Sequence, residues 1–203
     1  GEDIDGEAAG DYSGSSVSLS GDGSTIAIGA SLNDETGDNS GHIRIYQNIN
    51  NTWQQIGEDI DGEAAGDYSG SSVSFSNDGS TIAIGATGND GNGDRSGHVR
   101  IFQNNNNTWQ QIGDDIDGER FDDESGYSIS LSSDGSIVAV GSRYNDKNLW
   151  ENYRGHVRIF QNINSFWQQI GEDIDGEAAG DQSGSSVSPV SYTHLTLPTT
   201  SPV

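Results

Sequence analysis

The sequence predicts an all-β fold built from a repeated unit of four antiparallel strands, and three observations carry this prediction. First, residues 1–56 and 57–112 align without a gap and differ at 10 of 56 positions, and residues 113–170 form a third copy. Second, apolar residues within each copy alternate with small or polar ones, which is the period of a strand. Third, an Asp-Gly pair separates the first two alternating runs of each copy, a strong signal for a hairpin turn.

Each strand of the first copy has its own signal. Residues 16–20 and 25–29 alternate on either side of the turn at Asp22, so they predict the two arms of a hairpin. Residues 41–47 alternate again and predict the third strand. A polar asparagine run then turns the chain into a fourth strand at about 52–56.

The large apolar residues of these strands are expected to share one face of the sheet, with serine, alanine and glycine on the other. The residues placed on that face are Val17, Leu19, Ile26, Ile28, Ile43 and Ile45. Stacked sheets then interlock large against small side chains, whereas a lone sheet leaves its apolar face in water.

Four antiparallel strands in each repeat predict a partial β-propeller, an open arc of three four-stranded antiparallel blades plus the start of a fourth. Such an arc needs further blades, or another chain, to close its ring. The predicted units are blade repeat 1 at 1–56, blade repeat 2 at 57–112, blade repeat 3 at 113–170 and the start of repeat 4 at 171–188.

Residues 189–203 break the repeat. The run VSYTHLTLPT at 190–199 resembles translated sequencing-adapter sequence. We therefore expect this tail not to be native, the alternative being a genuine linker rich in threonine and proline.

Several short motifs recur in all three copies. In the first they are SGSSV at 13–17, the turn at Asp22, IAIGA at 26–30 and GHIRIY at 41–46. These motifs resemble FG-GAP repeats, the blades of integrin-alpha-type β-propellers, over nearly all of 1–188. The resemblance implies an extracellular or cell-surface module for adhesion or for binding a protein or another ligand, without enzymatic activity.

Two departures limit what the resemblance implies. The family's Phe-Gly pair is Ser-Gly in every copy, as at Ser13. The family's calcium loop between the first two strands is absent, because the turns at Asp22, Asp78 and Asp134 are too short to supply enough ligands. That calcium site is therefore not carried over to this chain.

The charge of the chain excludes some partners. It has 8 Lys+Arg against 32 Asp+Glu, a formal net charge of −24, so we expect no nucleic-acid partner. The sequence contains no run of roughly 18 apolar residues, so we expect no membrane insertion in this segment. Only Asp22, Asp78 and Asp134 fall in the tight turns, so the acids concentrate on the opposite loop face, where a protein or glycan ligand is expected to bind.

Part of this acidic face has the spacing of a calcium site. Carboxylates stand at alternate positions around a glycine, and hard oxygen ligands at that spacing are what Ca²⁺ prefers. The candidate ligands are Asp3, Asp5, Glu7 and Asp11 in the first copy, and Asp59, Asp61, Glu63 and Asp67 in the second. The alternative is a solvated acidic surface that keeps the protein soluble.

One histidine opens the third strand of each copy, at His42, His98 and His156. A residue repeated in every blade is expected to hold the blade together, so we expect these side chains to form hydrogen bonds between strands, the alternative being a metal-binding or acid–base role. The periodic tryptophans are expected in the core for the same reason.

The third copy departs from the repeat in two loops. The Ala-Ala-Gly of the other copies becomes Arg120-Phe121-Asp122, and the loop at 145–154 gains two residues. Aromatic and arginine side chains supply much of the energy at protein interfaces, so these loops predict a partner site. Its candidate residues are Arg120, Phe121, Trp150 and Tyr153. The alternative is neutral drift of the loops.

Three functions therefore remain open. The first is the non-enzymatic binding module that the resemblance implies, and a ring of similar loops suits weak contacts that add by avidity. The second is a propeller that is part of, or accessory to, a secreted hydrolase. The third is an acidic calcium-binding matrix or scaffold protein. Fold alone does not decide among them.

Overall fold

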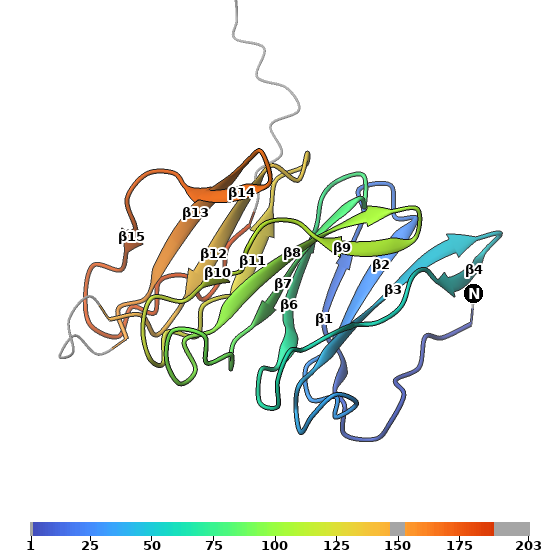
Figure 1. Cartoon of the computed structure of the whole chain (residues 1–203), viewed down its shortest axis with the longest axis horizontal. Coiled ribbons are helices and arrows are strands. Elements are labelled where there is room, and N and C mark those ends of the chain that lie inside the picture. The colour runs from blue at the N-terminus through green and yellow to red at the C-terminus, as the bar shows by residue number, and fades with distance from the viewer. Residues whose placement is uncertain (1, 147–152, 189–203) are drawn as a thin grey trace, which may run out of the picture.

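A computed structural model describes residues 2–146 and 153–188, and three antiparallel sheets standing side by side make up the fold (Figure 1). All the regular secondary structure of the described residues is strand. These residues accordingly include no helix long and apolar enough to cross a membrane. The predicted all-β fold with an open arc of blades is confirmed.

Each sheet has the same topology. Four strands run in sequence order, and a fifth strand of two residues pairs with the third strand next to the fourth. The first sheet contains β1 (Ser13–Leu19), β2 (Thr25–Ala30), β3 (His42–Ile49), β4 (Thr52–Gln55) and β5 (Ile60–Asp61). The second contains β6 (Ser69–Phe75), β7 (Thr81–Ala86), β8 (His98–Asn105), β9 (Thr108–Gln111) and β10 (Ile116–Asp117). The third contains β11 (Ser128–Leu131), β12 (Ile137–Ser142), β13 (His156–Ile163), β14 (Phe166–Gln169) and β15 (Ile174–Asp175).

The outer edge of each blade is interrupted. In the first sheet β4 pairs with the end of β3, whereas β5 pairs with its beginning. Between them the chain leaves the ladder, and Gly57 adopts a φ of 78°. An interruption of this kind turns a side chain out of the regular alternation of a strand. Asp59 lies in this segment, and its position matters below.

The tight turns are closed by their own side chains. In the first blade Asp22 accepts hydrogen bonds from the backbone N–H of Ser24 (2.9 Å) and the hydroxyl of Ser20 (2.8 Å). The third blade repeats this arrangement, and the hydrogen bonds of Ser132 and Ser136 lower the pKa of Asp134 to about 2. The Asp-Gly hairpins expected from the sequence are thus formed within one repeat.

The register corrects the expected face pattern. Ile28 pairs with Val17, and these two side chains share a face as predicted. Ile43, however, pairs with Gly29, and Ile45 pairs with Ala27, so both isoleucines lie on the opposite face. The expectation that all six large residues share one face is therefore wrong. Each blade instead has two apolar faces, one with large and one with mixed side chains.

The hydrophobic core lies between blades. The mixed face of the first sheet packs against the large face of the second, and the same contact recurs between the second and third sheets. The first interface buries Ala27, Ile43, Ile45, Ile56, Ile60, Phe75, Ile82, Ile84 and Phe102, with Val73 and Trp109 packed beside them. The expected core position of the periodic tryptophan is confirmed for Trp109 and for Trp167, which packs against the second interface.

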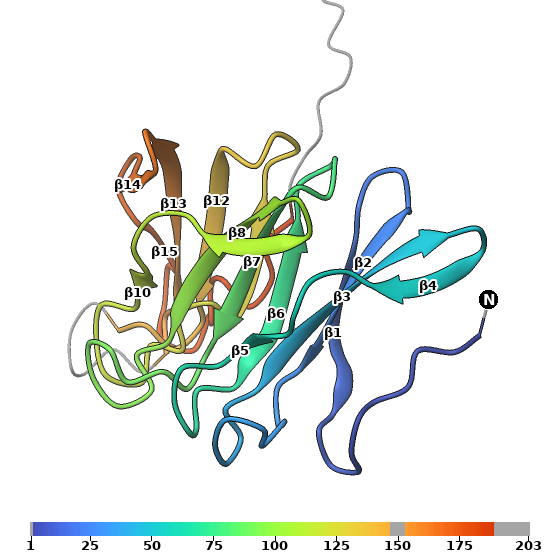
Figure 2. The same ribbon diagram turned by 45° about the vertical axis from the view of Figure 1, so that its right-hand side comes forward.

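The first strands of successive blades lie next to one another at the centre of the arc, β1 beside β6 (Figure 2) and β6 beside β11. The hydroxyl of Ser16 donates to the carbonyl of Gly70 across the gap (2.7 Å), and the N–H of Phe75 donates to the hydroxyl of Ser18 (3.0 Å). A Cβ on Gly29 would lie 2.3 Å from the carbonyl oxygen of Gly70, so only glycine permits this approach. These contacts fix the blade spacing.

Both ends of the arc are uncovered. Leu19 on the outer face of the first blade is 56% exposed, whereas the equivalent Phe75 and Leu131 are 7% and 2% exposed. At the other end, Ile174 is also exposed. The fourth repeat begins to form, since Ser183 bridges to Gly155 as Ser69 does to Gly41. The predicted tail at 189–203 lies outside the described residues.

Candidate functional site

The last acid of each predicted calcium set closes a loop. The carboxylate of Asp67 accepts hydrogen bonds from the N–H groups of Glu63 and Ala64 and from the amide of Asn89, at 3.0 to 3.3 Å. Asp123 accepts the three equivalent hydrogen bonds in repeat 3, and Asp11 accepts two, from the N–H of Ala8 and the amide of Asn33. Because the segment before the first strand of the blade and the loop after its second strand both bond to one buried carboxylate, this aspartate holds the loop face in shape.

The other acids of the second set separate along the chain. The strand β5 extends between Asp59 and Glu63, and an extended chain advances by ~3.3 Å per residue. Asp59 therefore faces the first blade, where its carboxylate lies 3.6 Å from Nδ1 of His42. Glu63 faces the second blade, where its carboxylate lies 3.9 Å from Nδ1 of His98. The segment from Asp59 to Glu63 thus supplies one carboxylate to each of two clusters.

The remaining acids contribute through their backbone. The carbonyl of Asp5 accepts a hydrogen bond from Arg44, and that of Asp61 accepts one from Arg100. Burial raises the pKa of the Asp61 carboxyl, which lies beside the first cluster. Asp3 lines a shallow pocket at the end of the arc. Calcium binding by these sets stays a prediction.

The structure brings together a histidine and acids in each repeat. All ligand atoms of one cluster lie within 4.8 Å of one another. The clusters are Glu7, Glu35, His42 and Asp59 in repeat 1, Glu63, His98 and Asp115 in repeat 2, and Glu119, His156 and Asp173 in repeat 3. Such groups of nitrogen and carboxylate oxygen atoms could hold a metal ion.

The histidines do not behave as the sequence led us to expect. Each side chain is 1% exposed, yet Nδ1 of His42 and both ring nitrogens of His156 have no hydrogen-bond partner among the described residues. Burial, followed by the charge of Arg158, lowers the pKa of His156 to about 4. A signal for these clusters was present in the sequence, because an aspartate follows each histidine by the same 17 residues.

The partner loops of repeat 3 converge on one pocket. Arg120, Phe121 and Tyr153 line a cavity of about 220 Å³ together with Tyr144. The rings of Tyr144 and Tyr153 lie 4.8 Å apart between centroids. Three carboxylates also line the cavity, those of Asp122, Asp146 and the buried Asp123. Trp150, the fourth residue predicted for this site, lies outside the described residues.

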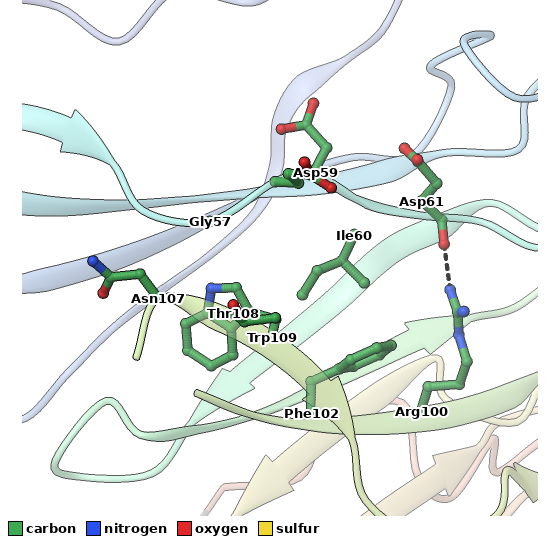
Figure 3. A pocket seen from close by; sticks show the side chains of 10 residues that line it. Gly57, Asp59, Ile60, Asp61, Arg100, Phe102, Asn107, Thr108 and Trp109 are labelled. Carbon is green, nitrogen blue, oxygen red and sulfur yellow. Dashed lines mark hydrogen bonds between the residues drawn. The ribbon is translucent and has the colours of Figure 1, made fainter. Parts of the chain in front are cut away.

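A larger cavity of about 530 Å³ opens where the first blade meets the second. Figure 3 shows its lining, with Arg100 reaching from β8 to the backbone of Asp61. Trp109 also lines the cavity, and its indole N–H donates to the carbonyl of Ile56 (3.3 Å). Arg158 binds the carbonyl of Asp117 in the same way and so joins the third blade to the second, whereas Arg44 binds the carbonyl of Asp5 in the segment before the first blade.

The fold and the repeated contacts between sheets define a β-propeller-type repeat protein. Residues 4–46 and 60–102 match the FG-GAP repeat family, so the chain carries FG-GAP repeats. Both matches fall within the two repeats that are nearly identical. No curated protein matches the chain.

One solved structure supports the fold, and a second shows a weaker likeness. A protein from Bacteroides uniformis, assigned as a 6-phosphogluconolactonase, is 20% identical with a TM-score of 0.51, over 78% of this chain and 40% of that one. Hydrazine synthase of Kuenenia stuttgartiensis is 14% identical with a TM-score of 0.48, over 75% and 40%. This chain thus spans less than half the length of either structure. At such identities the likeness concerns the fold alone.

Proposed function

We propose that the protein is a non-enzymatic, extracellular or cell-surface binding module that holds a protein partner at the repeat 3 loop pocket. The observation that carries the proposal is the exposure of Phe121, which is 67% accessible beside Tyr144 and Tyr153. Repeats 1 and 2 have alanine at the position of Phe121, so this site is a departure from an otherwise uniform loop face. Exposed aromatic groups beside a small pocket are typical anchors of protein interfaces.

The charge around the pocket favours a basic protein segment. Acidic side chains line the pocket, and the whole chain carries a formal net charge of −24, so its field attracts cations and speeds their encounter. Tyrosine rings in such surroundings also accept cations. The guanidinium carbon of Arg143 already lies 4.3 Å from the ring centroid of Tyr144. A partner arginine or lysine would bind in the same way.

The chain offers a matched pair of variants for the test. Phe121 and Phe166 are both 67% exposed, but Phe166 lies on β14, away from the pocket. Phe121→Ala installs the residue of repeats 1 and 2, and so does Phe166→Thr. Both variants therefore carry side chains that the repeat already tolerates.

The experiment measures binding of synthetic peptides that combine arginine with aromatic residues, by biolayer interferometry at physiological salt, with a glycan array run in parallel. We expect Phe121→Ala to weaken peptide binding by about 10-fold, as loss of an interface anchor does, and Phe166→Thr to leave it unchanged. Equal losses in both variants would overturn the proposal. Binding to glycans alone would overturn the protein partner and support the glycan ligand.

A further inference from the structure

The cluster of repeat 1 gathers ligand atoms from four separate segments. Nδ1 of His42 on β3 lies 3.6 Å from the Asp59 carboxylate, between β4 and β5, and 3.8 Å from the Glu7 carboxylate, ahead of β1. Glu35, from the loop between β2 and β3, completes the group within 4.8 Å. None of these residues is next to another in the sequence, so the fold itself assembles the cluster.

The distances in this cluster are too long for hydrogen bonds. A nitrogen donor binds an oxygen at 2.7–3.2 Å, and the two separations from His42 exceed that range. Nδ1 of His42 has no hydrogen-bond partner among the described residues, although the side chain is only 1% exposed. A buried polar atom without a partner costs free energy unless another group satisfies it. The nitrogen points into the carboxylates, which leaves room for a cation between them.

The spacing fits a bound ion. Two ligand atoms held ~2.0–2.1 Å from one tetrahedral Zn²⁺ lie roughly 3.3 Å apart. The separations of 3.6 Å and 3.8 Å from Nδ1 of His42 need only a small contraction to reach that value. Rotation of the exposed Glu7 side chain and a smaller adjustment of the half-buried Asp59 side chain supply such a movement without changing the backbone.

The charge also fits a divalent ion. The three carboxylates of repeat 1 and the guanidinium of Arg44 sum to a net charge of −2. Arg44 lies 3.6 Å from Oε1 of Glu7, whereas Oε2 of the same side chain faces His42. The arginine therefore fixes the orientation of Glu7 and leaves its second oxygen free for the ion.

We propose that His42, Glu7, Asp59 and Glu35 bind a divalent transition-metal ion of the Zn²⁺ class. The nitrogen ligand decides the class, because imidazole binds zinc and its neighbours in the first row, whereas Ca²⁺ and Mg²⁺ take oxygen ligands. The ion joins the segment before β1 to the third strand and to the outer edge of the blade. Because only the folded chain assembles this set, binding stabilises the fold.

The repeats provide an internal control. Glu35 of repeat 1 corresponds to Gly91 of repeat 2, whose cluster has three ligands where repeat 1 has four. The repeat 1 site therefore binds most tightly. Glu35→Gly converts it to the repeat 2 form, and Gly91→Glu makes the reverse change. Gly91 has no positive φ, and a Cβ there would lie 3.1 Å from Oδ1 of Asn89 and from Oδ1 of Asp117, so these two side chains must shift slightly to accept glutamate.

The experiment titrates ZnCl₂ and CaCl₂ separately into the full chain after chelation, using calorimetry for affinity and stoichiometry and thermal unfolding for stability. We expect one tight Zn²⁺ site and a higher Tm with Zn²⁺, with Ca²⁺ at least about 10-fold weaker. Glu35→Gly should weaken the tight site by about 10-fold, and Gly91→Glu should create a second one. The visible spectrum of bound Co²⁺ should change in His42→Gln, which reports nitrogen ligation independently of stability.

Three results would overturn the inference. The first is the absence of Zn²⁺ binding below millimolar concentration in the unaltered chain. The second is equal affinity for Zn²⁺ and Ca²⁺, since it would exclude a nitrogen ligand. The third is unchanged Zn²⁺ affinity in both Glu35→Gly and Gly91→Glu when their far-ultraviolet spectra match that of the unaltered chain.

Discussion

The first strands of the first and second blades are nearly identical in sequence, yet their surroundings differ. Leu19 at the end of β1 is 56% exposed, whereas Phe75 at the same position of β6 packs against the first blade and is 7% exposed. The hairpin and the backbone ladder are the same in both blades. The comparison shows that a blade forms its strands from its own sequence but obtains its apolar stabilisation from the blade next to it.

The largest effect on stability is expected from truncating the side chain at the equivalent position in both blades. Phe75→Ala should lower the free energy of unfolding by about 3–5 kcal/mol, because it leaves a cavity in the core between blades. Leu19→Ala should lower it by less than about 0.5 kcal/mol, because the side chain already contacts water. Urea unfolding followed by tryptophan fluorescence measures both. Similar losses would mean that the outer face of the first blade is covered in solution.

A smaller effect is expected from the serines that bond neighbouring blades. The hydroxyl of Ser74 accepts a hydrogen bond from the N–H of Leu131 (3.0 Å), whereas the equivalent hydroxyl of Ser130 is buried without a partner among the described residues. Ser74→Ala should therefore cost about 1 kcal/mol, and Ser130→Ala should be neutral or slightly stabilising. The same unfolding assay distinguishes them. A loss at Ser130 equal to that at Ser74 would indicate that a further strand bonds to it.

The smallest effect is expected at a turn whose side-chain hydrogen bonds do not involve the neighbouring blade. The turn at Asp134 is closed within its own repeat, and its pKa of about 2 lies below the ordinary value of 3.8. Between these two pKa values the unfolded chain therefore binds more protons than the folded chain. The contribution of the turn to the free energy of unfolding is complete above about pH 4 and is lost as the pH falls towards 2. Asp134→Asn should flatten this acid dependence slightly, since the group is exposed to solvent.

Asp22→Asn is the control for that measurement, because hydrogen bonds also lower the pKa of Asp22 in the end blade. Stability from pH 2 to 6, measured by urea unfolding, should respond alike in the two variants. A response in only one of the two blades would contradict a self-contained turn.

Local features of this fold were predictable from the sequence, and features that depend on register were not. Alternation and the turn at Asp22 gave the strands, because both act over a few residues. The faces of Ile43 and Ile45 could not be assigned, because the long loop between β2 and β3 does not fix how these strands align. Alternation within one strand says nothing about which residue lies opposite in the next.

The candidate sites show the same limit. Phe121 and Tyr153 were found because they interrupt a repeat, and the structure places them together. Tyr144 was not predicted, because the equivalent residues of repeats 1 and 2, Leu32 and Gly88, already differ from each other. A third residue type at this position therefore does not stand out as a departure from the repeat. The acids that group with each histidine were not predicted, because they come from segments that are distant in the sequence and meet only in the folded blade.

The contacts between blades are copies of one another. The serine-to-glycine hydrogen bonds of Ser16, Ser72 and Ser128 measure 2.7, 2.6 and 2.7 Å, and each uses the same positions of the repeat. An in-frame recombination event that inserts or deletes one 56-residue unit therefore recreates an existing junction and requires no compensating substitution. The number of blades encoded by the gene can therefore change in a single step. A new side chain at a junction, by contrast, must fit the neighbouring blade in every repeat that acquires it.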